Sequence, residues 1–234
     1  MDQAGHPTAL AFDLEAGSPF FFKCQVCSVC CSNKAIRISP YEALRLARRL
    51  GITTTELYRA YTEEGGTVLK NEPDGTCIFL DSRGCGVHPH RPLVCRLFPL
   101  GQIMDQQGKP KYASMPLHPD CLGLFDTDGT VESYLESQGA GPYFYYDRVY
   151  AALCQRLREN PPAQQGTAEK PSTGIGLDAE GRDVGASSSF LSLWLDIDAS
   201  VAAYCKSKNK TVPQDLDELV SLHVRALNEW IAGT

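Results

Sequence analysis

The chain has 234 residues, of which 43% are hydrophobic and 21% charged. This composition indicates an ordinary globular protein with enough residues to bury a sizeable core. Its 22 basic and 28 acidic side chains give a net charge of −6, which argues against binding driven mainly by nucleic-acid phosphates or anionic lipid. No apolar run approaches the ~20 residues of a membrane span. Residues 1–16 also lack the order of a secretory signal, so we expect a cytoplasmic protein without a membrane segment.

The first half of the chain predicts short elements. Residues 20–23 are an apolar approach to a cysteine-rich stretch, 24–31, whose tight spacing indicates a loop wrapped around an ion. Residues 35–39 alternate apolar and basic side chains and predict a short strand. Two helices follow, over 40–50 and from 54 to about 61. Each is preceded by a capping box, which satisfies the first backbone amides of a helix.

Four arginines on this helix pair make a DNA-binding helix–turn–helix unit one possible interpretation. They are Arg45, Arg48, Arg49 and Arg59. We interpret the pair as a helical hairpin with solvated arginines, because the protein is acidic overall and both helices are short.

The remaining chain changes from strands to helices. Residues 71–123 are rich in Gly, Pro and Asp and favour short strands and turns. Helical spacing of apolar residues predicts a helix over 142–159 and two final helices, with stripes over 190–204 and 216–230. Between them, 161–188 has the composition of a flexible loop. The pattern predicts an α+β protein in which an irregular, metal-nucleated cysteine module with short strands and a helical hairpin (20–125) precedes a mainly helical half (126–234).

Cysteine is the residue type that stands out. Ten occur, and eight of them fall between residues 24 and 121. The chain is neither short nor visibly exported, so metal binding or redox chemistry explains them better than a disulfide scaffold. The eight candidate metal ligands are Cys24, Cys27, Cys30, Cys31, Cys77, Cys85, Cys95 and Cys121.

The spacing of the first cysteines fits an iron–sulfur cluster. Cys24, Cys27 and Cys30 form a C-x2-C-x2-C run, which lets three thiolates hold one cluster while a distant cysteine completes it. Zinc remains open, because a C-x2-C pair and a second pair would make a closed tetrahedron. Successive side chains tend to point apart, so we expect Cys31 to turn to a second metal or to the downstream cysteines. Eight thiols suffice for two four-thiolate sites, and a single cluster with spare thiols nearby is the alternative.

Two arginines flank Cys95 in a segment bracketed by prolines. Arg91 and Arg96 are therefore candidate cofactor-binding residues, which would balance the negative charge of a thiolate-ligated cluster or hold an anionic ligand. Surface salt bridges are the simpler alternative. His88, His90 and His118 lie near the cysteines as further ligand or supporting candidates, with solvated loops as the alternative.

The remaining cysteines and one histidine are predicted to be core residues, and several common catalytic motifs are absent from the sequence. Cys154, Cys205 and His223 lie on apolar helix faces and are expected to pack in the core. No phosphate-binding loop, nucleophile elbow or dinucleotide fingerprint occurs. The C-x3-C-x2-C spacing of radical S-adenosylmethionine enzymes is also absent.

The order and spacing of these motifs resemble a known family. The relevant pieces are the 24–31 run, Cys77-x-Phe79-Leu80, Cys85, Arg91-Pro92-x-x-Cys95-Arg96-x-Phe98-Pro99 and Cys121-x-Gly123. Together they resemble the CxxCxxCC cysteine-cluster proteins, also called YkgJ-like proteins, which are described as zinc- or iron-chelating domains. The resemblance covers about residues 20–125. His88 departs from it, because the family often has tyrosine there.

The resemblance adds one activity to the list of expectations. A distant relative, flagellin lysine N-methylase, is thought to combine an iron–sulfur cluster with S-adenosylmethionine, which implies methyl transfer as one branch. Our leading prediction is an iron–sulfur protein, with a [4Fe–4S] cluster favoured, that serves redox chemistry or such a transfer; whether it is an enzyme is left open. The alternatives are a structural zinc-binding interaction module and an iron or zinc carrier. We expect a protein or small-molecule partner rather than nucleic acid or a membrane.

Overall fold

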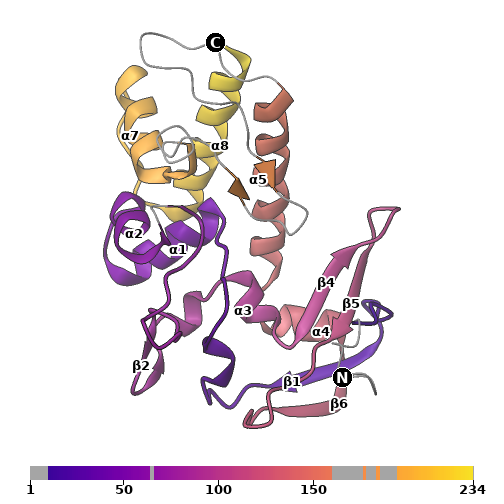
Figure 1. The fold of residues 1–234 in the computed structure, drawn as a ribbon. Coiled ribbons are helices and arrows are strands. Elements are labelled where there is room, and N and C mark those ends of the chain that lie inside the picture. The colour runs from indigo at the N-terminus through magenta and orange to yellow at the C-terminus, as the bar shows by residue number, and fades with distance from the viewer. Residues whose placement is uncertain (1–9, 64–65, 160–175, 178–182, 185–193, 234) are drawn as a thin grey trace. The chain divides into compact units, whose positions relative to one another are not determined.

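The computed structural model describes residues 10–63, 66–159, 176–177, 183–184 and 194–233. Contacts divide the chain into two units. Unit 1 combines Met1–Lys34 with Asn71–Pro142, and unit 2 combines Ala35–Lys70 with Tyr143–Thr234. The predicted α+β class is confirmed, since short antiparallel strands precede a helical C-terminal half (Figure 1). Its position in the sequence assigns the helix pair over 40–61 to the cysteine module at 20–125. By its contacts it belongs to unit 2. The division at 125/126 stays a prediction.

Unit 1 contains most of the strands. In chain order its elements are β1 (Pro19–Lys23), the 3-10 turn η1 (Val29–Cys31), β2 (Leu80–Asp81), β3 (Gly84–Cys85), the 3-10 turn η3 (His88–His90), α3 (Leu93–Leu97), β4 (Leu100–Met104), β5 (Pro110–Ser114), β6 (Leu124–Thr130) and α4 (Val131–Ser137). The strands pair antiparallel as β1 with β6, β2 with β3 and β4 with β5. The sequence pattern missed the first of these pairs, because β1 has only five residues and its partner begins 101 positions after its end.

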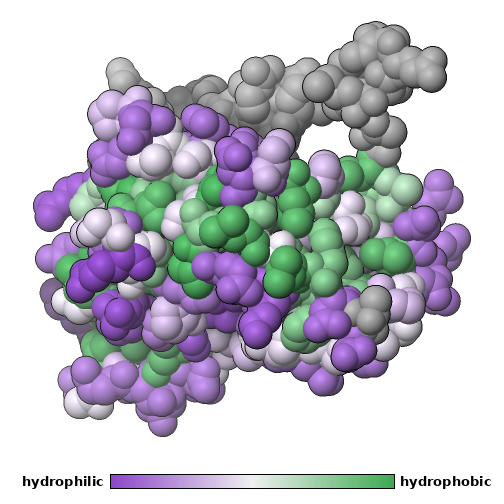
Figure 2. Space-filling model, turned by 90° about the horizontal axis from the view of Figure 1, so that it is seen from below, coloured by the Kyte–Doolittle hydropathy of each residue, from purple (hydrophilic) through white to green (hydrophobic). Residues whose placement is uncertain are grey.

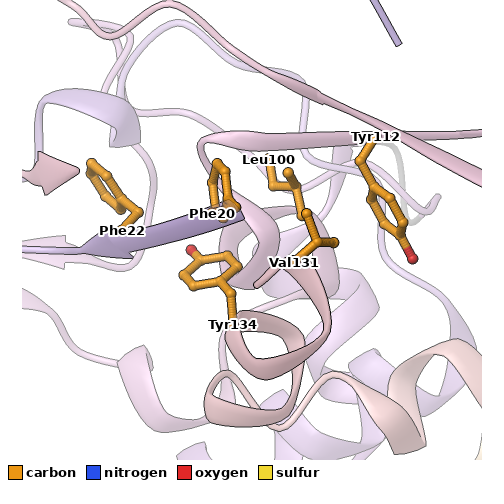
Figure 3. Close-up of a cluster of buried hydrophobic side chains, with 6 residues drawn as sticks. All are labelled: Phe20, Phe22, Leu100, Tyr112, Val131 and Tyr134. Carbon is orange, nitrogen blue, oxygen red and sulfur yellow. The ribbon is translucent and has the colours of Figure 1, made fainter. Parts of the chain in front are cut away.

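A small apolar core holds unit 1 together. Phe20 and Phe22 project from β1, and alternation along the strand buries both while Pro19 and Lys23 stay exposed. They pack with side chains of β4, β5 and α4, as Figure 3 shows. The Tyr134 hydroxyl also donates a 2.8 Å hydrogen bond to the Phe98 carbonyl. The complete cluster is Phe20, Phe22, Leu100, Tyr112, Val131 and Tyr134.

Unit 2 is helical. Its elements are α1 (Pro40–Leu50), α2 (Thr54–Tyr61), the greater part of α5 (Gly141–Glu159), the short strands β7 (Gly176–Leu177) and β8 (Asp183–Val184), α7 (Ile197–Ser207) and α8 (Leu216–Ala232). Both predicted capping boxes are present, since Ser39 and Thr53 exchange hydrogen bonds with Glu42 and Glu56. α1 then ends where Gly51 adopts the left-handed backbone conformation that favours glycine.

Two sequence-based expectations about this helical region need correction. Residues 35–39 form no regular strand, and only Arg37 makes an isolated bridge, to Val68. Arg48 is not simply solvated, because its guanidinium pairs with Asp198 at the start of α7. Most of the loop predicted over 161–188, and the start of the stripe over 190–204, lie outside the described residues; within that loop β7 pairs with β8.

His223 is a core residue, as its apolar surroundings predicted. Its side chain is fully buried on α8, 2.8 Å from the Tyr150 hydroxyl and 3.0 Å from the Trp194 carbonyl. A carbonyl can only accept, so Nε2 donates to Trp194 and Nδ1 accepts from Tyr150. Burial lowers the pKa of His223 to about 4, so the ring is neutral at pH 7. The described helices include none with the length and apolarity needed to cross a membrane.

Candidate metal centre

The N-terminal cysteine loop turns through three left-handed backbone positions. Val26, Ser28 and Asn33 have φ values of 54°, 66° and 55°. Such values are uncommon outside glycine and costly for a β-branched residue such as valine. Between the last two, η1 carries Cys30 and Cys31. Strained backbone of this kind persists only where the surrounding structure holds it, as in many functional loops.

The second group of cysteines is joined to this loop through the backbone. The amide of Cys77 donates a 2.8 Å hydrogen bond to the carbonyl of Cys31, and the amide of Asn33 donates one of 2.8 Å to Gly75. The hairpin of β2 and β3 then pairs Leu80 with Cys85. Cys31, Cys77 and Cys85, which are 54 positions apart at most, are thereby brought into one region.

Arg96 fixes the segment that carries Cys95. Its side chain is 7% exposed, and its three donor groups reach backbone carbonyls. Nε donates to Arg91 at 3.0 Å, Nη1 to Gln138 at 2.7 Å and Nη2 to Pro89 at 2.5 Å. Arg96 thus ties the turn before α3 to the end of α4. A role in binding an anionic ligand stays a prediction.

The charge of Arg91 contributes to the pKa shifts of Cys30 and Cys85, and its side chain also makes hydrogen bonds of its own. Its guanidinium donates to the His88 carbonyl at 2.8 Å and to Gln138 Oε1 at 2.6 Å. Burial lowers the pKa of Arg91, nearby Arg96 lowers it further, and the thiolates of Cys24 and Cys95 oppose this. The guanidinium interacts electrostatically with four predicted ligands: Cys24, Cys30, Cys85 and Cys95. Its charge therefore acts on several thiols, and its role as a cofactor-binding residue stays a prediction.

A second cation was missed by the sequence reasoning. Lys34 Nζ lies 4.5 Å from the centre of the Phe98 ring, and its charge helps to lower the pKa of the Cys30 thiol. Its signal in the sequence is a lysine three positions after Cys31, which is weak because lysine is common on surfaces.

Cys30 and Cys31 do not point fully apart, contrary to the expectation for successive residues. Their thiols are hydrogen-bonded to each other. That bond is the main reason why the pKa of Cys30 falls to about 6, with Lys34 and Arg91 adding to it against the effect of burial. The same bond, together with burial, raises the pKa of Cys31. The nearby charges of Lys34 and Arg91 thus favour the thiolate form of Cys30.

Cys27 and Cys121 form the other thiol pair. Their side chains are hydrogen-bonded to each other. The backbone amide of Leu122 donates to Cys27 Sγ and is the largest cause of its lowered pKa. Two residues after Cys121, Gly123 leaves no room for a side chain, since an added Cβ would lie 2.1 Å from Cζ of Phe22. The C-x-G motif therefore lets this cysteine approach the core beside β1.

Backbone amides donate to several of the sulfurs in one repeated pattern. In each case the donor is the amide two residues after the cysteine. The five donor–acceptor pairs are Val26 to Cys24, Val29 to Cys27, Phe79 to Cys77, Val87 to Cys85 and Gly123 to Cys121. Hydrogen bonds of this kind favour the thiolate and lower its pKa, although burial is the larger effect for Cys77, Cys85 and Cys121 and raises theirs.

His88 and His118 contact an arginine side chain and a backbone amide, respectively. Burial lowers the pKa of His88, whose Nδ1 is 3.3 Å from Arg91 Nη1. The His118 side chain is 59% exposed and accepts from the amide of Asp120 at 3.2 Å. Neither contact marks them as ligands. Cys205 is buried in α7 as predicted, and Cys154 is half-buried on α5.

The donor set fits a thiophilic metal. All ten cysteines lie in the described part of the chain, and none forms a disulfide bond. The described side chains hold no ready-made group of three or more His, Cys, Asp or Glu with metal-site geometry. The fit therefore rests on the chemistry of the eight thiols, their contacts and the donors aimed at them. Zinc and iron–sulfur clusters both take such ligands.

Apolar side chains next to Cys27 and Cys121 face solvent. Val26 is 47% exposed, Leu122 65%, Leu124 62% and Phe125 51%. Hydrophobic residues also stand among hydrophilic ones on the face drawn in Figure 2. Large exposed apolar residues grouped beside a site are typical of surfaces that bind other molecules.

These features define a cysteine-rich module, and comparison with known proteins supports metal binding by it. Residues 23–114 match the CxxCxxCC family, "Putative zinc- or iron-chelating domain". The resemblance inferred from the cysteine spacing is thereby confirmed for this segment, and the match supports metal binding. An uncharacterized protein of Methanocaldococcus jannaschii is 31% identical over 116 residues, which is 47% of this chain and 62% of that protein. No solved structure matches the chain.

Proposed function

We propose that the cysteines of unit 1 hold an iron–sulfur cluster, with [4Fe–4S] the favoured form, that serves redox chemistry or a cluster-assisted transfer reaction. When bound, such a cluster takes up or releases single electrons. The chain contributes the thiolates, the amides that donate to them, and the cations Lys34 and Arg91. The proposed ligands are drawn from Cys24, Cys27, Cys30, Cys31, Cys77, Cys85, Cys95 and Cys121.

One observation carries the proposal: backbone amides donate to five of the eight thiols in the same i+2 geometry. Five such turns are not expected of cysteines that merely fill a core, because a buried thiol needs no donor. Amide donors and nearby cations stabilise the negative charge of a thiolate-ligated cluster and set its potential. The C-x2-C-x2-C run favours iron–sulfur over zinc.

Anaerobic purification tests the identity of the metal. We expect a coloured protein containing iron and acid-labile sulfide, with Mössbauer spectra of a cluster. Cys30→Ser should lose both elements, whereas Cys154→Ser, which alters a half-buried cysteine of unit 2, should keep them. A colourless protein with stoichiometric zinc and no sulfide would overturn the proposal in favour of a structural zinc module or a metal carrier.

The transfer branch has its own test. We propose S-adenosylmethionine as a second ligand of the cluster-loaded protein, on the family resemblance alone. Isothermal titration calorimetry of S-adenosylmethionine into the anaerobic protein should give a saturable heat. If no heat of binding is measured, the methyl-transfer hypothesis is rejected and the redox hypothesis is retained.

We also propose a protein partner and a cytoplasmic location. The exposed apolar residues beside Cys27 and Cys121 support the first. Ten cysteines without a disulfide support the second, because thiols persist in reducing compartments. Replacing Phe125 by a photoreactive amino acid and identifying the crosslinked protein would test the partner. Cell fractionation would test the location.

A further inference from the structure

We infer that the outer edge of β4 docks a second copy of this chain, whose own β4 pairs antiparallel with the first and joins two hairpins into one sheet. β4 has five residues in unbroken register with β5. In the described part of the chain, no other strand pairs with its outer edge. Figure 1 shows β4 and β5 as a two-stranded arm whose tip stands clear of the other elements of unit 1. This surface is separate from the thiols, so the inference does not depend on the identity of the metal.

The hydrogen bonds of β5 show which backbone groups of β4 point outward. Tyr112 in β5 exchanges two hydrogen bonds with Leu14 on its far side, at 3.0 and 2.9 Å, so its amide and carbonyl point away from β4. Opposite residues of an antiparallel pair either bond to each other or both point away. Gln102, which lies opposite Tyr112, therefore directs its amide and carbonyl to the free edge. Leu100 and Met104, two positions away on either side, do the same.

This row of backbone groups is self-complementary. If two β4 strands run antiparallel about a two-fold axis at Gln102, each Gln102 lies opposite its own copy. Leu100 of each strand then lies opposite Met104 of the other. All of these residues point toward the facing strand, so each opposite pair can exchange both of its backbone hydrogen bonds. A two-fold interface of this kind closes on itself and forms a dimer rather than a fibre.

The apolar side chains of β4 match in the same register. Ile103 is 44% exposed and Met104 54%, whereas Leu100 at the other end of the strand is buried. In the paired arrangement, Met104 of one copy meets Leu100 of the other, and Ile103 meets Gly101. Cross-strand apolar pairs of this kind stabilise a sheet. The exposed end of each strand is thereby covered by the buried end of its partner.

Charge favours a second copy over a partner of different chemistry. None of residues 100–104 is charged, although edge strands commonly carry charged side chains that prevent such pairing. β6, by contrast, carries Asp126 and Asp128 and would repel its own copy. A strongly basic or acidic partner strand would find no opposite charge on β4.

The central side chain also fits its own copy. Gln102 Oε1 is buried and has no hydrogen-bond partner among the described residues. A buried carboxamide oxygen without a donor is uncommon in folded proteins. The carboxamide of the facing Gln102 has two donors and can supply one.

Sedimentation velocity of the full-length protein over a concentration series tests the association. One strand pair makes a small interface, so we expect a reversible equilibrium between monomer and dimer. Gln102→Lys places like charges directly opposite each other and should weaken dimerisation about fivefold or more. Phe125→Lys, which alters an exposed residue of β6, is the matched control and should leave dimerisation unchanged. A protein that stays monomeric at every concentration, or a dimer that Phe125→Lys weakens and Gln102→Lys does not, would overturn the inference.

Hydrogen exchange on the wild-type chain, measured by NMR, avoids a variant that fails to fold. The amides of Gln102 and Met104 point outward in the monomer and should gain protection as the concentration rises. The amides of Gly101 and Ile103 point toward β5 and should change little. Protection that gathers in another segment would show that the copies meet elsewhere. A monomer in which β4 is instead protected by a different protein would show another occupant, and either result would refute the inference.

Discussion

Gly123 offers the sharpest test of how the core positions the metal centre. A methyl group built at this residue would lie 2.1, 2.7 and 3.0 Å from three ring atoms of Phe22. Ordinary contact begins near 3.4 Å, so the ring or the backbone must move by about 1 Å. Phe22 is 4% exposed and enclosed by the core of unit 1. Overpacking of this kind costs about 1–3 kcal/mol.

The assay is urea unfolding of Gly123→Ala at matched metal content. We expect a lower midpoint than for the wild type, together with weaker metal retention, because the shift also displaces the amides that donate to Cys121 and Cys27. Gly17→Ala is the matched control: an added Cβ there meets nothing within 4 Å. It should leave the midpoint unchanged or raise it slightly, since alanine restricts the unfolded chain.

A double-mutant cycle identifies the cause. If the cost arises from the Phe22 ring, Phe22→Leu should reduce the penalty of Gly123→Ala, with a coupling energy of about 1 kcal/mol or more. Equal penalties in the two backgrounds, or a Gly123→Ala protein as stable as the wild type, would show that the close packing described here does not control this position.

Three further outcomes follow from buried groups and from the metal. Arg96→Lys should lower the free energy of unfolding by about 3 kcal/mol, because the one ammonium group of a lysine side chain cannot reach all three backbone carbonyls at once. Urea unfolding measures this loss. Arg83→Lys is the control and should show no loss, because the Arg83 side chain is 89% exposed. Unfolded His223 binds a proton below pH 6.5, whereas the folded protein resists protonation until about pH 4. Stability should therefore rise with pH across this window by up to about 3 kcal/mol. His223→Gln should flatten that slope, and a slope unchanged in this variant would contradict the assignment. Chelation of the bound metal should increase hydrogen exchange in the cysteine loops while the amides of the β1–β6 pair stay protected; simultaneous exchange of both would contradict this.

Local signals predicted much of the helical structure. Capping boxes at Ser39 and Thr53 and a glycine stop at residue 51 act within a few positions, so the sequence displays them directly. Pairing between distant segments leaves no such mark. β1 reads as an apolar approach to the cysteines, and only its partner β6, more than a hundred positions later, makes it a strand. The Arg48–Asp198 ion pair is equally remote in sequence.

The candidate site was predictable as a list of donors but not as an arrangement. Cysteine spacing identifies the thiols because a metal requires several of them close together. The amides that donate to the sulfurs carry no residue-type signal, since every residue except proline has one. Lys34 looks like any surface lysine until Phe98 and Cys30 are placed beside it. The three carbonyls to which Arg96 donates belong to residues up to 42 positions away, so the sequence does not reveal them.

The arrangement also changes the idea that an ion alone gives the cysteine module its shape. Phe20 and Phe22, which precede the first cysteine, and four residues between Leu100 and Tyr134 build one apolar core, against which Cys121 packs. Each fully buried apolar side chain contributes about 1.5–3 kcal/mol before entropy costs, so these six give the strands and α4 a reason to fold that needs no metal. Phe79 and Val87, which follow Cys77 and Cys85, are buried as well. The loop that carries Cys24, Cys27 and Cys30 contains left-handed valine and serine and amides aimed at sulfur, and we expect a bound ion to hold this strained backbone. We therefore expect the ion to order the cysteine loop, and we expect the apolar core to fold without it.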